Sequence, residues 1–297
     1  MTLIVACIPA YNEEQTIAKV LIETSKHVDK ILVCNDGSKD MTSEIAQHLG
    51  ATVFEHPQNM GKGAALRTLF EACKSLHPDA VVTLDADWQH DAKEIPKLVE
   101  PIVKGVADIV IGSRFLNSDK NTPNYRKIGH RIINSLFEEA SGSKISDTQS
   151  GFRAYSSKAL NTITLNSKGI EIDSEILLDA TRKGLRVIET PITIRYEGDT
   201  STYNPISHGY TVASYIIQKI LLGRPLLLLG LPGLTLLGIG LYLSTIVIDY
   251  YTASRYFSVP FALGAIFFFT VGILILLTSI MLYAISIILK EAIRKPS

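Results

Sequence analysis

The chain has 297 residues with 29 basic and 29 acidic side chains, so its formal net charge at pH 7 is zero. A neutral balance gives no electrostatic reason to expect nucleic acid as a partner. The cysteines Cys7, Cys34 and Cys73 show no CxxC or Cys/His spacing, which argues against a disulfide framework and against a zinc site.

Residues 1–200 alternate short apolar runs with amphipathic stretches. Helical periodicity marks 13–27, 41–49, 61–76 and 92–103, and strand-like runs occupy 3–9, 30–36, 51–56, 80–87 and 107–113. This alternation is typical of a mostly parallel sheet with helices on both faces. It predicts an α/β domain of Rossmann-like type over residues 1–204, and such sheets bind ligands at the carboxyl ends of their strands.

Polar clusters follow three of the predicted strands, at residues 9–13, 35–38 and 85–87. Each cluster alone is compatible with ordinary turn and cap chemistry. Three clusters at one sheet edge instead favour a shared ligand. We expect Asp36 to accept a hydrogen bond from a nucleobase or ribose, and Asp40 to cap the helix that begins at about residue 41.

Asp85 and Asp87 are two residues apart on a predicted strand, so their side chains would point the same way. Unneutralised carboxylates that close repel each other, and a divalent cation relieves the repulsion. Hard oxygen ligands favour Mg²⁺ or Mn²⁺, which takes further oxygens from a diphosphate. Gln89 is expected to supply a neutral oxygen or to orient a metal-bound water, and His90 to be structural. Lys62, between two glycines, lies where backbone can approach an anion.

Residues 123–140 form a predicted helix with an apolar face and basic residues around it. Such a helix either lies in the membrane interface, where it meets an anionic lipid head, or packs on the sheet with a solvated basic face. We favour the lipid role. Arg126, Arg131 and Ser135 are the expected contacts of a lipid phosphate.

A further helical stretch, 171–183, begins with acidic residues. Its Asp173 and Glu175 either favour the helix N-terminus or, as the family resemblance described below implies, meet sugar hydroxyls. Arg195 follows a final predicted strand, where it is expected to close over the diphosphate.

Charged residues are almost absent from the last third of the chain. Residues 205–223 have the apolar spacing of a helix at the membrane interface. Two uncharged runs, 226–248 and 259–289, are each long enough to cross a bilayer, so 224–297 is predicted to be a membrane domain. Basic residues flank the outer ends of both runs, whereas Arg255 is the only basic residue of the loop between them. The positive-inside rule therefore places the polar domain and both termini in the cytoplasm.

Six motifs in this order carry a family resemblance: PAYNEE, DGSKD, GKGAAL, DADWQH, GSRF and DTQSGFRA, followed by the two apolar runs. Over residues 3–196 the chain resembles family 2 glycosyltransferases of the GT-A fold, of the dolichol-phosphate mannose synthase type. The resemblance implies Mg²⁺- or Mn²⁺-assisted, inverting transfer of one sugar from a nucleotide sugar to dolichyl or another polyprenyl phosphate in a lipid bilayer. The donor stays open between GDP-mannose, UDP-glucose and UDP-N-acetylglucosamine, because the segment after Arg195 lacks the lysine of the mannose synthases.

The resemblance also implies roles for single residues. The nucleotide sugar would contact residues at the strand ends, namely Pro9, Tyr11, Asn12, Glu13, Asp36, Lys62, Asp85, Ala86 and Arg195. The metal ion would be held by Asp85, Asp87 and Gln89. The catalytic set would be Asp87, Arg114 and Asp147, with Asp147 as a general base or as an orienting group, and with Gln149 and Arg153 supporting its loop.

Two other functions are compatible with these motifs. A polysaccharide synthase of the same fold would carry a QxxRW signature and more spans, whereas Trp88 is the single tryptophan here. A membrane-anchored nucleotide-sugar-binding scaffold without activity is the second alternative. A dehydrogenase is excluded because no GxGxxG follows the first predicted strand.

Overall fold

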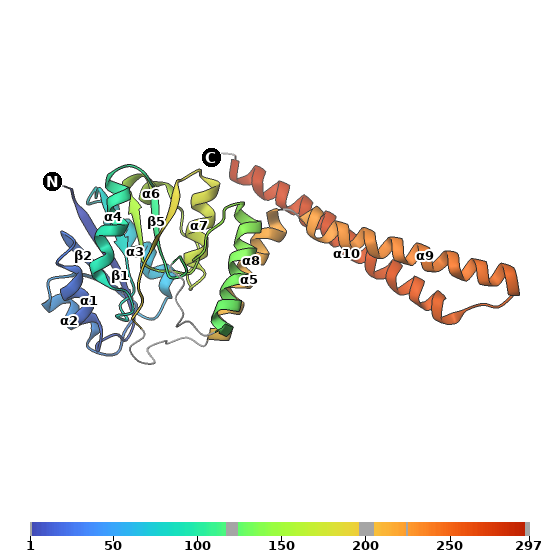
Figure 1. Cartoon of the computed structure of the whole chain (residues 1–297), viewed down its shortest axis with the longest axis horizontal. Coiled ribbons are helices and arrows are strands. Elements are labelled where there is room, and N and C mark those ends of the chain that lie inside the picture. The colour runs from blue at the N-terminus through green and yellow to red at the C-terminus, as the bar shows by residue number, and fades with distance from the viewer. Residues whose placement is uncertain (1, 117–123, 196–204, 224, 295–297) are drawn as a thin grey trace. The chain divides into compact units, whose positions relative to one another are not determined.

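The computed structural model describes residues 2–116, 124–195, 205–223 and 225–294 (Figure 1). The chain divides into two compact units, Met1–Ile216 and Ile217–Ser297. The division falls inside helix α8 (Pro205–Gly223), which has the bounds predicted for the helix that joins the two domains.

A seven-stranded sheet of order β3-β2-β1-β4-β6-β5-β7 forms the centre of the first unit. Its strands are β1 (Ile4–Ala10), β2 (Lys30–Asn35), β3 (Thr52–Glu55), β4 (Ala80–Thr83), β5 (Ile109–Ser113), β6 (Arg153–Ser156) and β7 (Val187–Pro191). Neighbouring strands are parallel except at β6, which runs antiparallel to both β4 and β5. The mostly parallel sheet is confirmed. β6 was not predicted, because its four residues lie inside a polar motif and carry no apolar run.

Helices cover both faces of this sheet, as predicted (Figure 1). On β1, Ala6 and Ile8 pack in one core with residues of α1 (Ile17–Thr24), α2 (Thr42–His48) and α4 (Ile95–Val103). Val5 and Cys7 pack in a second core with α3 (Lys62–Lys74), α6 (Ser157–Thr162) and α7 (Ile172–Arg182). Successive side chains of a strand point to opposite faces, so β1 is buried on both sides. This unit also contains α5 (Asn124–Ser141), a 3-10 turn (Ala92–Glu94) and most of α8.

The strand order determines where the site lies. β1 pairs in parallel with β2 on one side and with β4 on the other. The carboxyl ends of these three strands therefore lie at one edge of the sheet. The polar clusters that follow them in sequence are brought to that edge.

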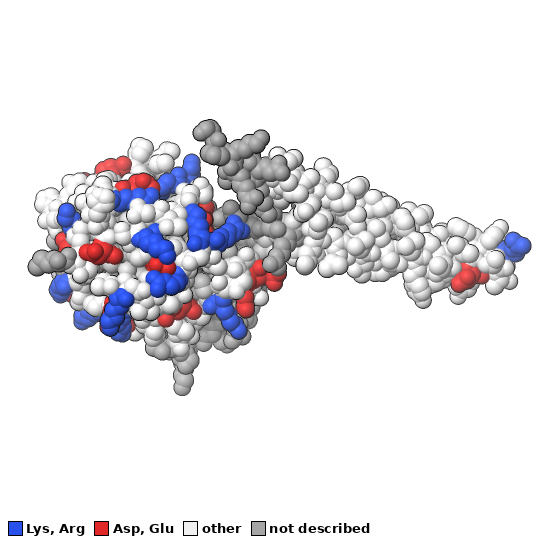
Figure 2. All heavy atoms as spheres, turned by 90° about the horizontal axis from the view of Figure 1, so that it is seen from above, with Lys and Arg blue, Asp and Glu red and all other residues white. Residues whose placement is uncertain are grey.

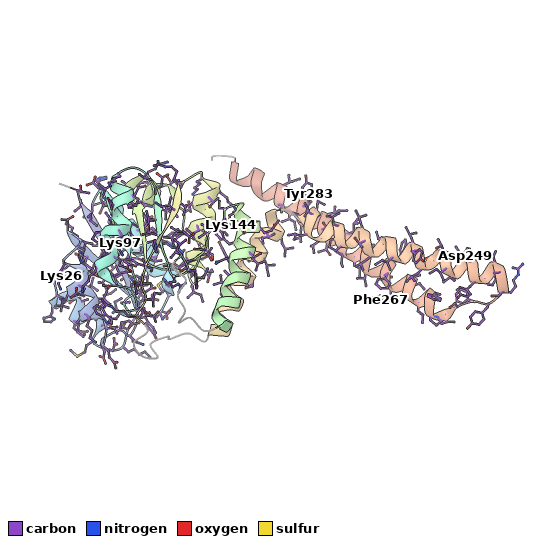
Figure 3. All side chains as sticks on the ribbon, in the orientation of Figure 1. Lys26, Lys97, Lys144, Asp249, Phe267 and Tyr283 are labelled. Atoms are coloured by element: carbon purple, nitrogen blue, oxygen red, sulfur yellow. The ribbon has the colours of Figure 1, made fainter. Side chains whose placement is uncertain are left out.

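The second unit contains a π-helical turn (Leu226–Gly230), α9 (Leu231–Ser254) and α10 (Val259–Arg294). Two candidate membrane spans, Leu226–Ser254 and Val259–Ile288, have mean hydropathies of 2.1 and 2.6. Among the described side chains of α9, α10 and the loop between them, only Asp249 and Arg255 are charged (Figures 2 and 3). Residues 249–258 were predicted to be loop, but α9 continues to Ser254, so the loop begins at Arg255, which has a positive φ of 56°.

Small residues let α9 and α10 approach each other closely. A Cβ at Gly240 would lie 3.0 Å from the amide nitrogen of Phe269, and one at Gly233 would lie 3.1 Å from that of Leu276. Close backbone contact at glycines is the usual means by which apolar helices associate in a membrane. The two spans thus form a packed hairpin.

Candidate functional site

The loops that follow β1 and β2 are bonded to each other. The Asn12 amide donates to Ser38 Oγ at 2.9 Å, and the Glu13 amide donates to Thr42 Oγ1 at 2.8 Å. Asp40 Oδ1 accepts from the Thr42 amide at 3.1 Å and so holds the start of α2, as expected. The first two polar clusters are therefore in direct contact.

Asp36, at the end of β2, is only 4% exposed and uses both carboxylate oxygens within the chain. Oδ1 lies 2.6 Å from His56 Nδ1 and accepts from the Met60 amide at 2.9 Å, while Oδ2 accepts from the Gly61 amide at 2.7 Å. The carboxylate that was expected to face a nucleotide thus orders the loop that leads into α3.

The aspartate pair lies in a turn and not on a strand. β4 ends at Thr83, Trp88 has a positive φ of 65°, and the Gln89 amide donates to Asp87 Oδ1 at 3.0 Å. The prediction that strand alternation aligns the two carboxylates is therefore wrong. Burial, and then the repulsion of Asp85, raise the pKa of Asp87 in this turn.

Lys62, the first residue of α3, joins this turn to α7. Its Nζ lies 2.9 Å from Asp85 Oδ1 and 3.1 Å from Asp173 Oδ2. Burial alone would raise the pKa of Asp85, but Lys62, with His90 and Arg114, outweighs burial and the pKa falls to about 2. A Cβ at Gly151 would lie 2.6 Å from Asp85 Oδ2 and 2.8 Å from Lys62 Nζ, so a larger residue there would have to displace the ion pair.

The amino end of α3 is anchored on the chain's own backbone. The Gly63 and Ala64 amides donate to the Lys168 carbonyl at 2.7 and 3.2 Å. A Cβ at Gly61, where φ is 95°, would lie 2.4 Å from that same oxygen. The glycines that were predicted to admit an anion thus admit a carbonyl group, which also offsets the positive end of the helix dipole.

Both acidic residues at the start of α7 are buried and bonded. Asp173 is 6% exposed and holds Lys62, whereas Glu175 is 4% exposed. Glu175 Oε2 accepts from the Ser167 amide at 2.7 Å and from the Asn166 amide at 3.3 Å. Asp173 therefore fixes the ammonium group of Lys62, and Glu175 fixes the loop that anchors α3.

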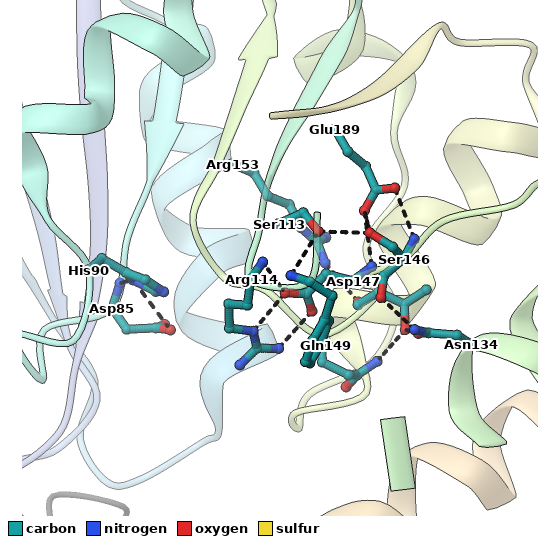
Figure 4. Close-up of polar contacts among 12 residues, drawn as sticks. Asp85, His90, Ser113, Arg114, Asn134, Ser146, Asp147, Gln149, Arg153 and Glu189 are labelled. Atoms are coloured by element: carbon teal, nitrogen blue, oxygen red, sulfur yellow. Dashed lines mark hydrogen bonds and ion pairs between the residues drawn. The ribbon is translucent and has the colours of Figure 1, made fainter. Parts of the chain in front are cut away.

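Arg114 and Asp147 form a bidentate ion pair beyond β5 (Figure 4). Asp147 is 0% exposed, and its oxygens accept from Arg114 Nε at 2.6 Å and Arg114 Nη2 at 2.7 Å. Glu189 Oε1 in turn accepts from the Asp147 amide at 3.0 Å and from the Ser146 hydroxyl at 2.7 Å. In Figure 4 the Arg114 side chain lies between those of Asp147 and Asp85, so a firmly held positive charge faces the aspartate turn.

The residues after Asp147 support this loop, as expected. Gln149 Nε2 donates to Ser174 Oγ at 2.6 Å. The fully buried Arg153 donates from Nη1 to the Asp173 carbonyl at 2.9 Å and from Nη2 to the Thr148 carbonyl at 3.0 Å. These bonds connect the loop after α5 to the start of α7, the helix that holds Lys62.

Arg195 contacts the aspartate turn from the opposite side. Its Nη2 lies 2.9 Å from Asp91 Oδ1, and its guanidinium carbon lies 4.3 Å from the centre of the Trp88 ring. The Arg195 amide donates to the Gln89 carbonyl at 3.0 Å. The turn and the chain beyond β7 are thus fastened together.

The other predicted site residues differ in exposure. Pro9 and Tyr11 are half-buried at the end of β1, Ala86 is buried between the two aspartates, and Ser135 is exposed on α5. The side chains of Arg126 and Arg131 lie outside the described residues. Their expected contact with a lipid phosphate therefore stays a prediction.

Several residues of the site were not singled out from the sequence. They are the internal partners of the predicted residues: His56, Asp91, Gly151, Lys168 and Glu189. Two had a local signal, because His56 follows β3 directly and Gly151 lies within the motif DTQSGFRA. For the others only the tertiary structure shows the contact.

Asp85 and Asp87 of the turn have the oxygen ligands that a divalent cation takes. In the described part of the chain, no three or more His, Cys, Asp or Glu side chains are arranged to hold a metal ion. Asp85 and Asp87 nevertheless repel each other. Burial, and then the negative charges of these two aspartates, raise the pKa of Glu13 to about 7, although a hydrogen bond from Thr16 lowers it. A cation held by two carboxylates keeps coordination positions for phosphate oxygens.

Comparison with known proteins shows the family. The model for glycosyl transferase family 2 matches residues 5–164, more than half of the chain. The UDP-N-acetylglucosamine–dolichyl-phosphate N-acetylglucosaminyltransferase of Methanococcus voltae is 34% identical over 216 residues, which cover 65% of this chain and 86% of that protein. The dolichyl-phosphate hexose transferase of Haloferax volcanii is 30% identical over 215 residues, covering 71% and 91%.

A solved structure confirms the expected GT-A fold. Glucosyl-3-phosphoglycerate synthase from Mycobacterium tuberculosis, in complex with Mn²⁺, UDP and glucosyl-3-phosphoglycerate, matches with a TM-score of 0.58 at 22% identity. The match covers 74% of this chain and 79% of that one. The chain is a glycosyltransferase with two candidate membrane spans. It belongs to glycosyl transferase family 2.

Proposed function

We propose that this glycosyltransferase moves one sugar from a nucleotide sugar to dolichyl or another polyprenyl phosphate, with inversion at the anomeric carbon. The donor is GDP-mannose, UDP-glucose or UDP-N-acetylglucosamine. The names of the relatives from Methanococcus voltae and Haloferax volcanii support a dolichyl-phosphate acceptor. The catalytic unit and both chain ends lie on the cytoplasmic side, in accordance with the positive-inside rule.

One observation carries the proposal: an excess of carboxylate groups at the sheet edge where GT-A enzymes bind their donors. Lys62 neutralises Asp85, but Asp87 and Glu13 have raised pKa values because burial and neighbouring carboxylates disfavour their charged forms. A bound cation would stabilise the charged forms of these two carboxylates. A divalent ion bound there would stabilise the charge that develops on the departing nucleoside diphosphate.

The acceptor needs little help from a base. A phosphate monoester is largely ionised near neutral pH, so its oxygen can attack the anomeric carbon while the bond from that carbon to the diphosphate oxygen breaks. The electron pair leaves with the nucleoside diphosphate, and no proton has to be removed from the acceptor. Asp147 has both oxygens bound to Arg114, so in our proposal it orients the guanidinium toward the phosphates and is not the general base.

Product analysis tests this proposal. The full-length protein in detergent is given each of the three donors with a labelled sugar, Mn²⁺ or Mg²⁺, and dolichyl phosphate, and the lipid fraction is separated by chromatography. We expect a single labelled lipid-linked monosaccharide with one of the donors. An elongating saccharide would instead indicate a polysaccharide synthase, and no product with any donor would favour the scaffold alternative.

Asp87→Asn provides the site-specific part of the test. Removing the charge of this ligand should lower turnover by about 10²-fold or more and should abolish the stimulation by Mn²⁺. Glu100→Gln is the matched control, because Glu100 is an exposed carboxylate on α4 that pairs with Lys104, and it should retain wild-type turnover. Near-normal, metal-dependent activity of Asp87→Asn would remove Asp87 from the site.

A further inference from the structure

The Lys62 ammonium group lies against Asp85, one of the carboxylates proposed to bind the metal ion. It contacts Asp85 Oδ1 at 2.9 Å and Asp173 Oδ2 at 3.1 Å, and only 19% of its side chain is exposed. The three residues come from the start of α3, the turn after β4 and the first turn of α7. One cation thus bridges two carboxylates that belong to different elements, the buried Asp173 and the partly exposed Asp85.

The structure fixes this ammonium group firmly. The Lys168 carbonyl anchors the first turn of α3 through the Gly63 amide, and Glu175 holds the loop that carries Lys168. Gly151 closes the space on the other side, since even a methyl group there would touch Lys62 and Asp85. The position of the charge is therefore built into the fold, and it is not the chance geometry of a surface lysine.

A bare divalent ion meets an unfavourable site in this arrangement. Asp85 is already neutralised by Lys62, and an incoming metal ion would lie close to a like charge, which repels it. A diphosphate changes the balance, because its negative charges attract the metal ion and the ammonium group together. Asp173 offers the ammonium group a second carboxylate when Asp85 turns to the metal.

We propose that Lys62 is a tethered counter-ion that occupies Asp85 in the donor-free enzyme, so that the divalent cation is held tightly only together with a nucleoside diphosphate. Asp173 acts as the positioning residue that retains the ammonium group once Asp85 binds the metal. The inference rests on the proposed metal-dependent function. It adds to that function that the metal ion binds to the enzyme as a complex with the nucleotide.

Direct measurement of Mn²⁺ binding tests the inference without an activity assay. Free Mn²⁺ is followed by electron paramagnetic resonance while it is titrated into the full-length protein in detergent, first alone and then with saturating UDP or GDP. The wild-type protein should bind Mn²⁺ at least about tenfold more tightly with one of the nucleotides. Lys62→Met should bind Mn²⁺ alone about tenfold more tightly than the wild type, so that the effect of the nucleotide shrinks.

Two controls separate charge from structure. Lys62→Arg keeps the positive charge and should keep the low affinity for Mn²⁺ alone. Lys74→Met removes a lysine from the last turn of the same helix, where Lys74 pairs with the exposed Glu71, and should behave as the wild type. Equal affinity of wild type and Lys62→Met for Mn²⁺ alone would overturn the inference, as would equal gains in Lys62→Met and Lys62→Arg.

Asp173→Asn keeps the inference testable if thermal unfolding shows that Lys62→Met does not fold. This variant leaves Asp85 as the charged partner of Lys62, so Mn²⁺ binding with nucleotide should weaken severalfold; unchanged binding would contradict the inference. Tight Mn²⁺ binding by the wild type without nucleotide would refute the inference alone. A wild type that binds Mn²⁺ with neither nucleotide would refute the proposed function and the inference with it.

Discussion

The carboxylate groups of this site have two different roles. Asp36 and Asp147 are buried, and all four of their oxygens are bonded to groups of the chain, so they hold a loop and an arginine in place. Asp87 and Glu13 are partly buried among other carboxylates, and their pKa values are raised. Asp36 and Asp147 therefore hold the site in shape, whereas the charged forms of Asp87 and Glu13 would be stabilised by a bound cation.

Glu13 gives a pH dependence that can be measured. Burial is the largest cause that raises its pKa, from 4.5 in the ordinary group to about 7 in the folded protein. Between these values the folded protein binds more protons than the unfolded chain, so stability is lost as the pH rises from about 4.5 through about 7. Because Glu13 is only partly buried, solvent screening should reduce the loss to about 1 kcal/mol, below the full value of the shift.

The test measures the midpoint of thermal unfolding of the wild type and of Glu13→Gln between pH 5 and pH 8, without divalent cations. The midpoint of Glu13→Gln should rise relative to the wild type as the pH increases. Glu100→Gln, which alters a surface carboxylate, should run parallel to the wild type over this range. Parallel curves for Glu13→Gln as well would show that Glu13 titrates normally.

At the scale of elements, the site depends on how α3 and α7 are joined. The loop before α7 caps α3 through the Lys168 carbonyl, and Asp173 on α7 binds Lys62 on α3. β6 completes the connection, because its first residue, Arg153, is bonded to the Asp173 carbonyl. None of these contacts is local in sequence. A substitution in one of these elements should therefore alter the site by displacing the element that it contacts.

Gly63→Ala tests this coupling. Alanine is the better helix former by about 1 kcal/mol, yet a Cβ at this position would lie 2.4 Å from the Ser167 carbonyl oxygen. We expect overpacking to dominate, lowering stability by about 1–3 kcal/mol, and we expect turnover to fall because Lys62 is the preceding residue. Thermal unfolding and product formation are measured on the same preparation.

Gly105→Ala is the control for this variant. Gly105 has a φ of 67° with no atom within 4 Å of an added Cβ, so alanine there should cost stability through backbone conformation alone and should leave turnover unchanged. A Gly63→Ala protein that is more stable than the wild type and fully active would show that the loop at Lys168 can move away.

The whole molecule combines a polar catalytic unit with an apolar hairpin. In the described side chains of α9, α10 and the loop between them, only Asp249 and Arg255 are charged, and Asp249 lies near the end that carries the loop (Figure 3). Basic residues flank the outer ends of the two spans. The positive-inside rule therefore predicts that the Arg255 loop faces away from the cytoplasm.

Cysteine labelling checks this orientation. Ala253→Cys, near the exposed loop, should react with a membrane-impermeant maleimide in intact cells, whereas Lys26→Cys on the catalytic unit should react only after permeabilisation. The wild type serves as the background, because Cys7, Cys34 and Cys73 are each 0% exposed. The opposite labelling pattern would place the catalytic unit outside.

The sequence by itself determined the elements and the nature of the ligand groups. Apolar runs and helical periodicity predicted β1 to β5, the main helices and the two spans, since burial patterns are local and repeat with the period of the element. The placement of Asp85 and Asp87 near one sheet edge followed from the rule that ligands meet the carboxyl ends of parallel strands. These predictions needed no knowledge of long-range contacts.

Only the tertiary structure decided what each polar group does. The sequence could not show that Asp36 is bound by His56 and two amides, that Arg114 holds Asp147, or that Lys62 joins Asp85 to Asp173. The partners lie up to 111 residues apart, and a carboxylate after a strand looks the same in sequence whether its oxygens are free or occupied. The role of such a group depends on which donors surround it, and long-range packing alone sets that environment.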